Sequence, residues 1–299
     1  MTHQAKIFDD RPCTLGEGPI WHPERQQLFW FDIVNSKLLS RVGTQSFNWQ
    51  FDRNVSAAGW IDRDHLLIAS ETGLSRFNLV SGSEEMLCDI ESDNPLTRSN
   101  DGRADPWGGF WVGTMSKSGD TGMGTLYRWR PDHHGGGELQ VLKRDMSTPN
   151  SICFDHSRDC AYYSDTKTRI IWRIRVDPKN GWPLDEAAIF VDLRATDDHP
   201  ERKPDGAVVD AEGCLWSAQW GSARVARYSP EGAFLSAIDL PTGHTSCPAF
   251  GGQDFQHLFV TTARQKVPEN RSKWLEHAGN TFLVHLDVRG CAEPRVILK

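Results

Sequence analysis

The sequence predicts an all-β protein, a six-bladed β-propeller formed by one domain over residues 1–299. Three observations predict it. Apolar segments are short and alternate with polar residues, aromatic residues are frequent at 12 Trp and 14 Phe, and one order of turns and strands recurs along the chain. Short alternating segments rich in aromatic residues are typical of half-buried strands. A chain of 299 residues can form one large domain or two small ones, and the continuous repeat favours one.

Individual segments show the strand pattern directly. Residues 28–32 (LFWFD) and 169–176 (RIIWRIRV) alternate over lengths that suit strands rather than long helices. Only residues 267–278 (VPENRSKWLEHA) can hold a helical turn or two, with Pro268 at a suitable start and Gly279 just beyond the end. We expect this segment to decorate a loop.

The repeat unit consists of a small-residue turn, an apolar strand, a polar turn, an aromatic strand, a second polar turn and a third strand. The first copy is EGPIWHPERQQLFWFDIVNSKLLSRV, and later copies begin at Ala57, Asn100, Pro149, Pro204 and Ser246. The spacing of roughly 40–55 residues matches propeller blades of four strands. A pair of β-sandwiches with coincidental spacing is the alternative, but a sandwich does not require the repeated order.

Two polar segments are expected to form surface or rim loops within this domain. They are Asp132–Glu138 (DHHGGGE) and Asp197–Lys203 (DDHPERK). His133 and His134 lie beside three glycines, which is more typical of an exposed loop than of a zinc site.

Charge and composition exclude several partners. Lys and Arg number 33 against 40 Asp and Glu, a net charge of −7, so no basic footprint for nucleic acid or anionic lipid is present. No apolar run approaches the roughly 20 residues of a membrane helix, and the first ten residues lack a signal peptide's basic and apolar regions. The seven cysteines include no C-x-x-C pair, which fits reduced thiols in a cytoplasm. Cys153 and Cys160 are expected to be small core residues.

Polar residues at the start of successive repeats are the candidates for metal-binding and catalytic residues. In a propeller the inner strand of each blade lines the central channel, so these residues should converge on the axis. Glu17 (LGEGP), Asn100 (RSNDG), Asn150 (STPNS) and Asp205 (KPDGA) occupy this position. Glu17, Asn150 and Asp205 offer two carboxylates and an amide oxygen, the ligands that hard divalent cations prefer. The sequence therefore predicts a metal site in the central channel.

Ordinary turns are the alternative explanation of these motifs. In Asp-Gly and Asn-Asp-Gly the side chain often bonds its own backbone, and Gly supplies a positive φ. For Asp101 and Asp105 we keep this interpretation and expect turn or blade-stabilising residues. The shared phase of Glu17, Asn150 and Asp205 ahead of apolar strands favours the metal site for those three.

Longer segments around these residues carry a family resemblance. The chain resembles the senescence marker protein / gluconolactonase / regucalcin-like family of six-bladed propellers in LGEGPIWHPERQQLFWFDI, RSNDGRADPWGGFWVGTM, STPNSICFDHSRDCAYYSDT and KPDGAVVDAEGCLWSAQWGSARVARYSPEG. With TSCPAFGG and HLFVTTAR, these motifs span nearly the whole chain in the family's order. Several motifs in register are far more specific than any one of them.

The resemblance implies a ligand set and a substrate. Glu17, Asn150 and Asp205 match the family's ligands to one divalent metal ion, and Arg98 and Asn100 match residues that hydrogen-bond the substrate. Calcium is the ion expected in a structure, while zinc, manganese and magnesium accept the same ligands. Similar family members are lactonases that open sugar-acid lactones, such as gluconolactone or a pentonolactone, to aldonic acids.

The resemblance implies catalytic roles for two residues, and the chain departs from the family's pattern at one place. Asp205 is expected to act as general base and Arg98 to steady the developing oxyanion. The family often has an acidic residue after GTM that holds sugar hydroxyls, whereas Met115 is followed here by Ser116-Lys117-Ser118. With Ser118 in place of that acid, the pocket is expected to suit a different sugar.

Three other functions stay open from the sequence. A metal propeller can also hydrolyse organophosphates or aryl esters, or it can bind calcium as a non-enzymatic regulator. A protein-binding scaffold is the third, but such a scaffold is expected to carry WD or kelch signatures, which the chain lacks. The oligomeric state and the physiological lactone are not readable from the sequence.

Overall fold

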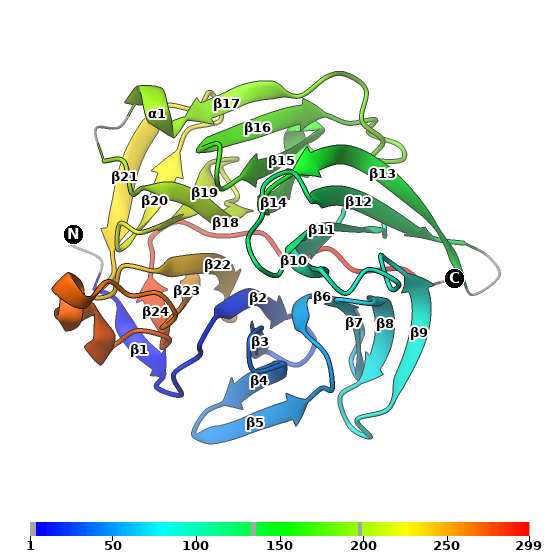
Figure 1. Ribbon diagram of the computed structural model, residues 1–299, viewed down its shortest axis with the longest axis horizontal. Helices are drawn as coiled ribbons and strands as arrows, with labels where there is room; N and C mark the ends of the chain where they lie inside the picture. Colours follow the sequence, from blue (N-terminus) through cyan, green and yellow to red (C-terminus); the bar gives the residue numbers. More distant parts are fainter. Residues whose placement is uncertain (1–3, 133–135, 197–198, 299) are drawn as a thin grey trace.

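Six four-stranded antiparallel sheets are arranged in a ring around a central axis in the computed structural model, which describes residues 4–132, 136–196 and 199–298 (Figure 1). In a propeller the channel runs along this axis. Each sheet is one blade, and the innermost strands are β2 (Gly16–His22), β6 (Val55–Asp62), β10 (Thr97–Ala104), β14 (Pro149–Asp155), β18 (Lys203–Val209) and β22 (Thr245–Gly251). The predicted six-bladed β-propeller is confirmed.

Five blades are each formed by four consecutive strands. Blade 1 contains β2 (Gly16–His22), β3 (Gln27–Asp32), β4 (Lys37–Val42) and β5 (Gln45–Gln50). Blade 2 contains β6 (Val55–Asp62), β7 (His65–Ser70), β8 (Gly73–Asn78) and β9 (Glu84–Asp89). Blade 3 contains β10 (Thr97–Ala104), β11 (Phe110–Ser116), β12 (Gly124–Pro131) and β13 (Gly137–Met146). Blade 4 contains β14 (Pro149–Asp155), β15 (Cys160–Asp165), β16 (Ile170–Arg175) and β17 (Ala188–Asp192). Blade 5 contains β18 (Lys203–Val209), β19 (Leu215–Trp220), β20 (Arg224–Tyr228) and β21 (Phe234–Asp239).

The sixth blade joins the two ends of the chain. β22 (Thr245–Gly251), β23 (His257–Thr262) and β24 (Thr281–His285) are completed by the N-terminal strand β1 (Lys6–Asp9). β1 pairs with β24, with Lys6 opposite Leu283. Pairing of β1 covers the edge of β24 that would otherwise be open, so the first strand of the chain closes the ring.

Helical segments are few and short among the described residues. They are the 3₁₀ turns η1 (His156–Arg158) and η2 (Glu269–Glu276) and the α-helix α1 (Leu193–Thr196). The helical turns expected within residues 267–278 are confirmed as η2, which begins after Pro268. In the described part of the chain, no helix is long and apolar enough to cross a membrane.

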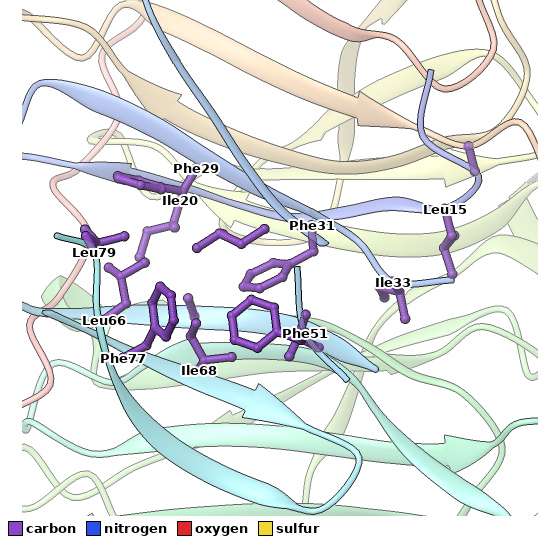
Figure 2. Close-up of a cluster of buried hydrophobic side chains, with 14 residues drawn as sticks. Leu15, Ile20, Phe29, Phe31, Ile33, Phe51, Leu66, Ile68, Phe77 and Leu79 are labelled. Carbon is purple, nitrogen blue, oxygen red and sulfur yellow. The ribbon is translucent and has the colours of Figure 1, made fainter. Parts of the chain in front are cut away.

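Apolar faces of neighbouring blades pack against each other. Figure 2 shows Phe29 and Phe31 of blade 1 facing Ile68 and Phe77 of blade 2. Phe29, Phe31 and Ile68 are fully buried, as the alternating pattern of these strands requires. Burial of each such side chain contributes about 1.5–3 kcal/mol, so the interfaces between blades hold the ring together. Cys153 and Cys160 are buried in a similar cluster, which confirms their expected core position.

The loop predictions hold in part. The segment expected at Asp132–Glu138 ends earlier, because Gly137 and Glu138 already belong to β13, where Gly137 pairs with Pro131. His133 and His134 lie outside the described residues, as do positions 197 and 198 of the second loop, which ends where Lys203 begins β18.

A C-terminal strap (residues 290–298) crosses the channel at the mouth where the inner strands end, here called the lower mouth (Figure 1). The Trp60 side chain donates to the Glu293 backbone oxygen at 2.8 Å, and the Ile297 amide donates to Gly108 at 3.0 Å. Glu293 forms a buried ion pair with Arg103, which also donates to backbone oxygens of blades 4 and 5. The strap therefore ties several blades together.

Replacement of Glu293 by glutamine is expected to lower the free energy of unfolding by about 2 kcal/mol, because a hydrogen bond between charged groups is replaced by a weaker one. Urea unfolding measures the change. Glu85→Gln, at an exposed position of β9, is the control and should change stability by less than about 0.5 kcal/mol. Equal stability of the two variants would contradict a structural role of the ion pair.

Candidate active site

A β-bulge interrupts all six inner strands near the mouth where they begin, here called the upper mouth. The register shifts lie at Glu17/Ile20, Val55/Ala57, Ser99/Gly102, Asn150/Cys153, Pro204/Ala207 and Thr245/Cys247. A bulge bends a strand and re-aims its side chains. Every candidate site residue lies in or beside one of these bulges, so the deviation from regular pairing brings polar groups from different blades together.

The three expected metal ligands are buried at this position. Glu17, Asn150 and Asp205 are 7%, 2% and 4% exposed. The Asn150 amide nitrogen donates to Thr166 Oγ1 at 2.7 Å, and its oxygen accepts from the Asn100 amide at 3.0 Å. Because a carbonyl oxygen has two lone pairs, Asn150 Oδ1 retains one acceptor site.

The two carboxylates lack full partners. Glu17 Oε2 accepts one weak hydrogen bond, from the Gly18 amide at 3.3 Å. Asp205 Oδ1 is buried without a hydrogen-bond partner. A buried acceptor without a partner is costly, whereas bound cations commonly satisfy such oxygens. This orphaned oxygen fits a cation ligand.

The raised pKa values of the two carboxyl groups also support a cation site. Burial, together with the nearby Asp101 carboxylate, raises the pKa of Glu17 to about 8. Burial, with the Glu17 carboxylate as the next cause, raises the pKa of Asp205 well above its usual range. Uncompensated carboxylates in a buried channel would be relieved by a cation. Two carboxylates and an amide oxygen are a donor set suited to a hard divalent ion.

Within the described ranges, no three or more His, Cys, Asp or Glu side chains lie close enough together to hold a metal ion by themselves. The candidate set therefore depends on the amide of Asn150 and on water.

Asp101 was expected to be a turn or blade-stabilising residue, and the structure gives it the second role. The Asp-Gly motif does not form a turn here, because Asp101 lies within β10 and is 5% exposed. Its carboxylate accepts from its neighbour Gly102 at 2.9 Å and from Ile152 of blade 4 at 2.8 Å. Asp101 thus stabilises the junction of blades 3 and 4 and adds a third carboxyl group beside Glu17 and Asp205. Asp205 likewise lies in a strand, β18, rather than a turn.

Arg98 and Asn100 belong to the same network. Arg98 Nη1 donates to the backbone oxygen of Ser99 at 2.7 Å and to Asn100 Oδ1 at 3.0 Å. Asn100 in turn donates to Asn150. Burial lowers the pKa of Arg98 to about 10, against the opposing effect of nearby carboxylates, of which Glu17 is the strongest. Arg98 therefore stays cationic at neutral pH and is held rigidly beside the candidate ligands.

The loop after β11 does contain an acidic residue, two positions beyond Ser118. Asp120 accepts hydrogen bonds from Ser118 and from Ser116, the latter at 2.9 Å. These bonds lower the pKa of Asp120. The carboxylate is therefore engaged by hydroxyl groups of its own loop.

A cavity of about 500 Å³ lies at the lower mouth, between the ends of β14 and β18 and the C-terminal strap. In contrast to the upper site, its carboxylates are paired with arginines. The pairs are Asp155 with Arg158, Asp210 with Arg227 and Glu293 with Arg103. Among the described residues, the carboxylates of the candidate ligands Glu17 and Asp205 form no ion pair, and they lie at the upper end of the channel.

Comparison with known proteins identifies the family. The family model described as the SMP-30/Gluconolactonase/LRE-like region matches residues 15–264. The chain belongs to this family. Two relatives within the SMP-30/gluconolactonase family cover nearly the whole chain. The 6-deoxy-6-sulfogluconolactonase of Pseudomonas putida is 33% identical over 98% of this chain and 99% of its own length. The L-arabinolactonase of Azospirillum brasilense is 32% identical, with coverages of 98% and 95%.

A solved structure of the same family superposes closely. The calcium-binding protein regucalcin of Agrobacterium tumefaciens has a TM-score of 0.93 and 33% identity, covering 100% of this chain and 99% of that chain. A luciferin-regenerating enzyme with a TM-score of 0.90 is 24% identical, and its likeness concerns the fold alone.

Two residues with hydroxyl groups lie beside the candidate ligands and were not predicted from the sequence. Ser151 follows Asn150 directly, and Thr166 lies after β15. Alignment of the repeats would have placed Ser151 opposite Gly18, the residue after Glu17. No comparable signal points to Thr166, since its contact with Asn150 depends on the pairing of β14 with β15.

Proposed function

We propose that residues 1–299 form one propeller domain that hydrolyses a sugar-acid lactone, gluconolactone-like or a pentonolactone, to the aldonic acid in a metal-dependent reaction in the cytoplasm. The observation that carries the proposal is the orphaned Asp205 Oδ1 in a buried site that also contains Glu17 and Asn150. The names of the relatives support the substrate class, because two of them are lactonases of sugar acids.

Glu17, Asn150 and Asp205 would hold the divalent ion. When bound, it would supply polarisation of the lactone carbonyl and a lowered pKa of a coordinated water. Calcium is our first choice for the ion, supported by the description of the Agrobacterium tumefaciens regucalcin as calcium-binding. Zinc, manganese and magnesium are the other candidates, since they accept the same oxygen ligands.

Three side chains of the protein would act as general base, oxyanion donor and substrate ligand. Asp205 accepts the proton of the attacking water, whose oxygen bonds to the carbonyl carbon. The bond from that carbon to the ring oxygen then breaks, and the ring oxygen takes up a proton, which yields a hydroxy acid. Arg98 carries a fixed positive charge suited to the developing oxyanion, and Asn100 orients the substrate's hydroxyl groups.

Replacement of Arg98 by alanine is expected to lower kcat by about 10²–10³-fold, the usual cost of losing one oxyanion donor. Acid release during lactone hydrolysis measures the rate. Arg98→Lys is the matched variant, and it should retain part of the activity because it keeps the charge but loses the planar donor geometry. Unchanged kcat in Arg98→Ala would exclude this role.

The decisive experiment is hydrolysis of five- and six-membered sugar lactones by metal-stripped protein refilled with each divalent ion in turn. Metal-dependent turnover of one lactone above the spontaneous rate is the expected result. Aryl esters and organophosphates belong in the same panel, because preference for them would replace the lactonase proposal with another hydrolase. Metal binding without any turnover would favour a non-enzymatic calcium-binding regulator; the regucalcin of Agrobacterium tumefaciens is described as a calcium-binding protein.

A further inference from the structure

Ser151 has a backbone conformation that side-chain-bearing residues rarely adopt. Its φ is +57°, in the left-handed region, and it directly follows the candidate ligand Asn150. In blade 1 the residue after the candidate ligand Glu17 is Gly18, with φ +52°. Glycine adopts this conformation without strain, whereas other residues pay an energetic cost. Blade 4 therefore keeps a serine where the same bulge in blade 1 has the less strained residue.

The hydrogen bonds of the Ser151 hydroxyl explain why a serine occupies this strained position. Ser151 is fully buried, and its Oγ donates to the backbone oxygen of Asp205 at 2.5 Å. It also accepts from Ser164 Oγ at 2.9 Å, which fixes the direction of the donated bond. Glycine could adopt the conformation but could not make this connection between blades 4 and 5.

Thr166 makes a second connection between the same two blades. The Asn150 amide nitrogen donates to Thr166 Oγ1 at 2.7 Å, and Thr166 Oγ1 donates to the backbone oxygen of Pro204 at 2.8 Å. Because the nitrogen is held by Thr166, the oxygen of the same amide faces Asn100 and the channel. The two connections end on adjacent residues, Pro204 and Asp205.

We propose that Ser151 and Thr166 are positioning residues for the metal site: their hydroxyls tie Asn150 to the backbone oxygens of Pro204 and Asp205. This connection sets the position of the Asn150 amide relative to the residue that carries the Asp205 carboxylate, as a divalent cation requires. The inference rests on the proposed function, in which those two residues are ligands. The ligands belong to different blades, so their separation depends on the contact between blades. Groups that orient ligands commonly change metal affinity by about 10–100-fold when removed.

Calcium titration of metal-stripped full-length protein by calorimetry tests the inference without relying on catalysis. Ser151→Gly removes the hydroxyl and relieves the strained φ. Thr166→Val keeps the shape of the side chain, removes its hydroxyl and leaves Ser151 unchanged. Each variant is expected to bind Ca²⁺ about 10–100-fold more weakly than the wild type. Thr166→Ser keeps a hydroxyl that can make the same two hydrogen bonds, so it should bind Ca²⁺ with nearly wild-type affinity.

Stability is measured in parallel to separate positioning from folding. Ser151→Gly should unfold at a urea concentration close to that of the wild type, because relief of strain offsets the lost hydrogen bond. Ser40→Ala is the control, since Ser40 is a buried serine that donates to the Leu28 backbone oxygen outside the channel. It should lose stability and retain wild-type Ca²⁺ affinity.

The outcomes distinguish the inference from the function on which it depends. Wild-type Ca²⁺ affinity in both Ser151→Gly and Thr166→Val would overturn the inference and leave the proposed metal site intact. Absence of binding of calcium, zinc, manganese and magnesium by the wild-type protein would overturn both. Weakened binding in both variants, with rescue by Thr166→Ser, supports the inference.

Discussion

Asp205→Asn is expected to lower kcat/KM for a sugar lactone by more than about 10³-fold, a larger loss than for Arg98→Ala. Asparagine has nearly the same shape as aspartate but cannot accept the water's proton and brings no charge to the cation. Asp205 Oδ1 is buried without a partner, so the substitution breaks no hydrogen bond of that oxygen. The loss should therefore be functional rather than structural.

The same variant should be more resistant to urea than the wild type when both are free of metal. Burial and the Glu17 carboxylate raise the pKa of Asp205 in the folded protein. At pH 7, above the pKa of an unfolded aspartate, folding must either bury this carboxylate as a charge or make it take up a proton, and both cost free energy. A side chain that is always neutral, such as asparagine, removes that cost. Loss of activity with gained stability is typical of a residue retained for function.

Rate assays, metal titration and urea unfolding of Asp205→Asn measure the three effects together. Asp52→Asn is the control, because the Asp52 side chain is 88% exposed; it should change none of them. Near-normal turnover and metal content in Asp205→Asn would remove the proposed mechanism.

The repeat explains why the fold was predictable and the details of the site were not. Each unit must bury the same apolar faces against its neighbours, so residues such as Phe29 and Phe31 occur with a period that the sequence displays. The candidate ligands Glu17, Asn150 and Asp205 share one position in that repeat, so the sequence could also indicate them. A bulge, in contrast, is a local change of register that leaves little trace in the order of residue types.

Asp101 and Asp105 illustrate the difference. Both were expected to be turn or blade-stabilising residues, and Asp105 does accept backbone hydrogen bonds from Trp107 and Gly109 in a turn, each at 2.9 Å. Asp101 lies four residues earlier, within the bulged part of β10, and reaches Ile152 in the next blade. Contacts between blades, such as this one or that of Thr166 with Pro204, require the three-dimensional arrangement.

Asp105→Ala is expected to lower the free energy of unfolding by about 3–5 kcal/mol, because it leaves a buried charge without its partner. Asp105 and Arg128 are both fully buried, and Asp105 Oδ2 accepts from Arg128 Nε at 2.7 Å. Burial already lowers the pKa of Arg128. The guanidinium would keep its bond to the Asn180 backbone oxygen and its contacts with the Trp182 and Trp107 rings, 5.2 Å and 6.0 Å from the ring centres, but no anionic partner among the described residues that could balance its charge.

A double-mutant cycle separates the pair from the turn that Asp105 also supports. Arg128→Met in the Asp105→Ala background removes the unpaired charge and should recover a large part of the lost stability, since apolar replacement of a whole buried pair is often neutral. Lactone hydrolysis under native conditions should stay near the wild-type rate, because Asp105 follows β10 at the lower mouth, away from the candidate ligands. Failure of Arg128→Met to restore any stability would assign the effect of Asp105 to its two backbone hydrogen bonds rather than to the ion pair.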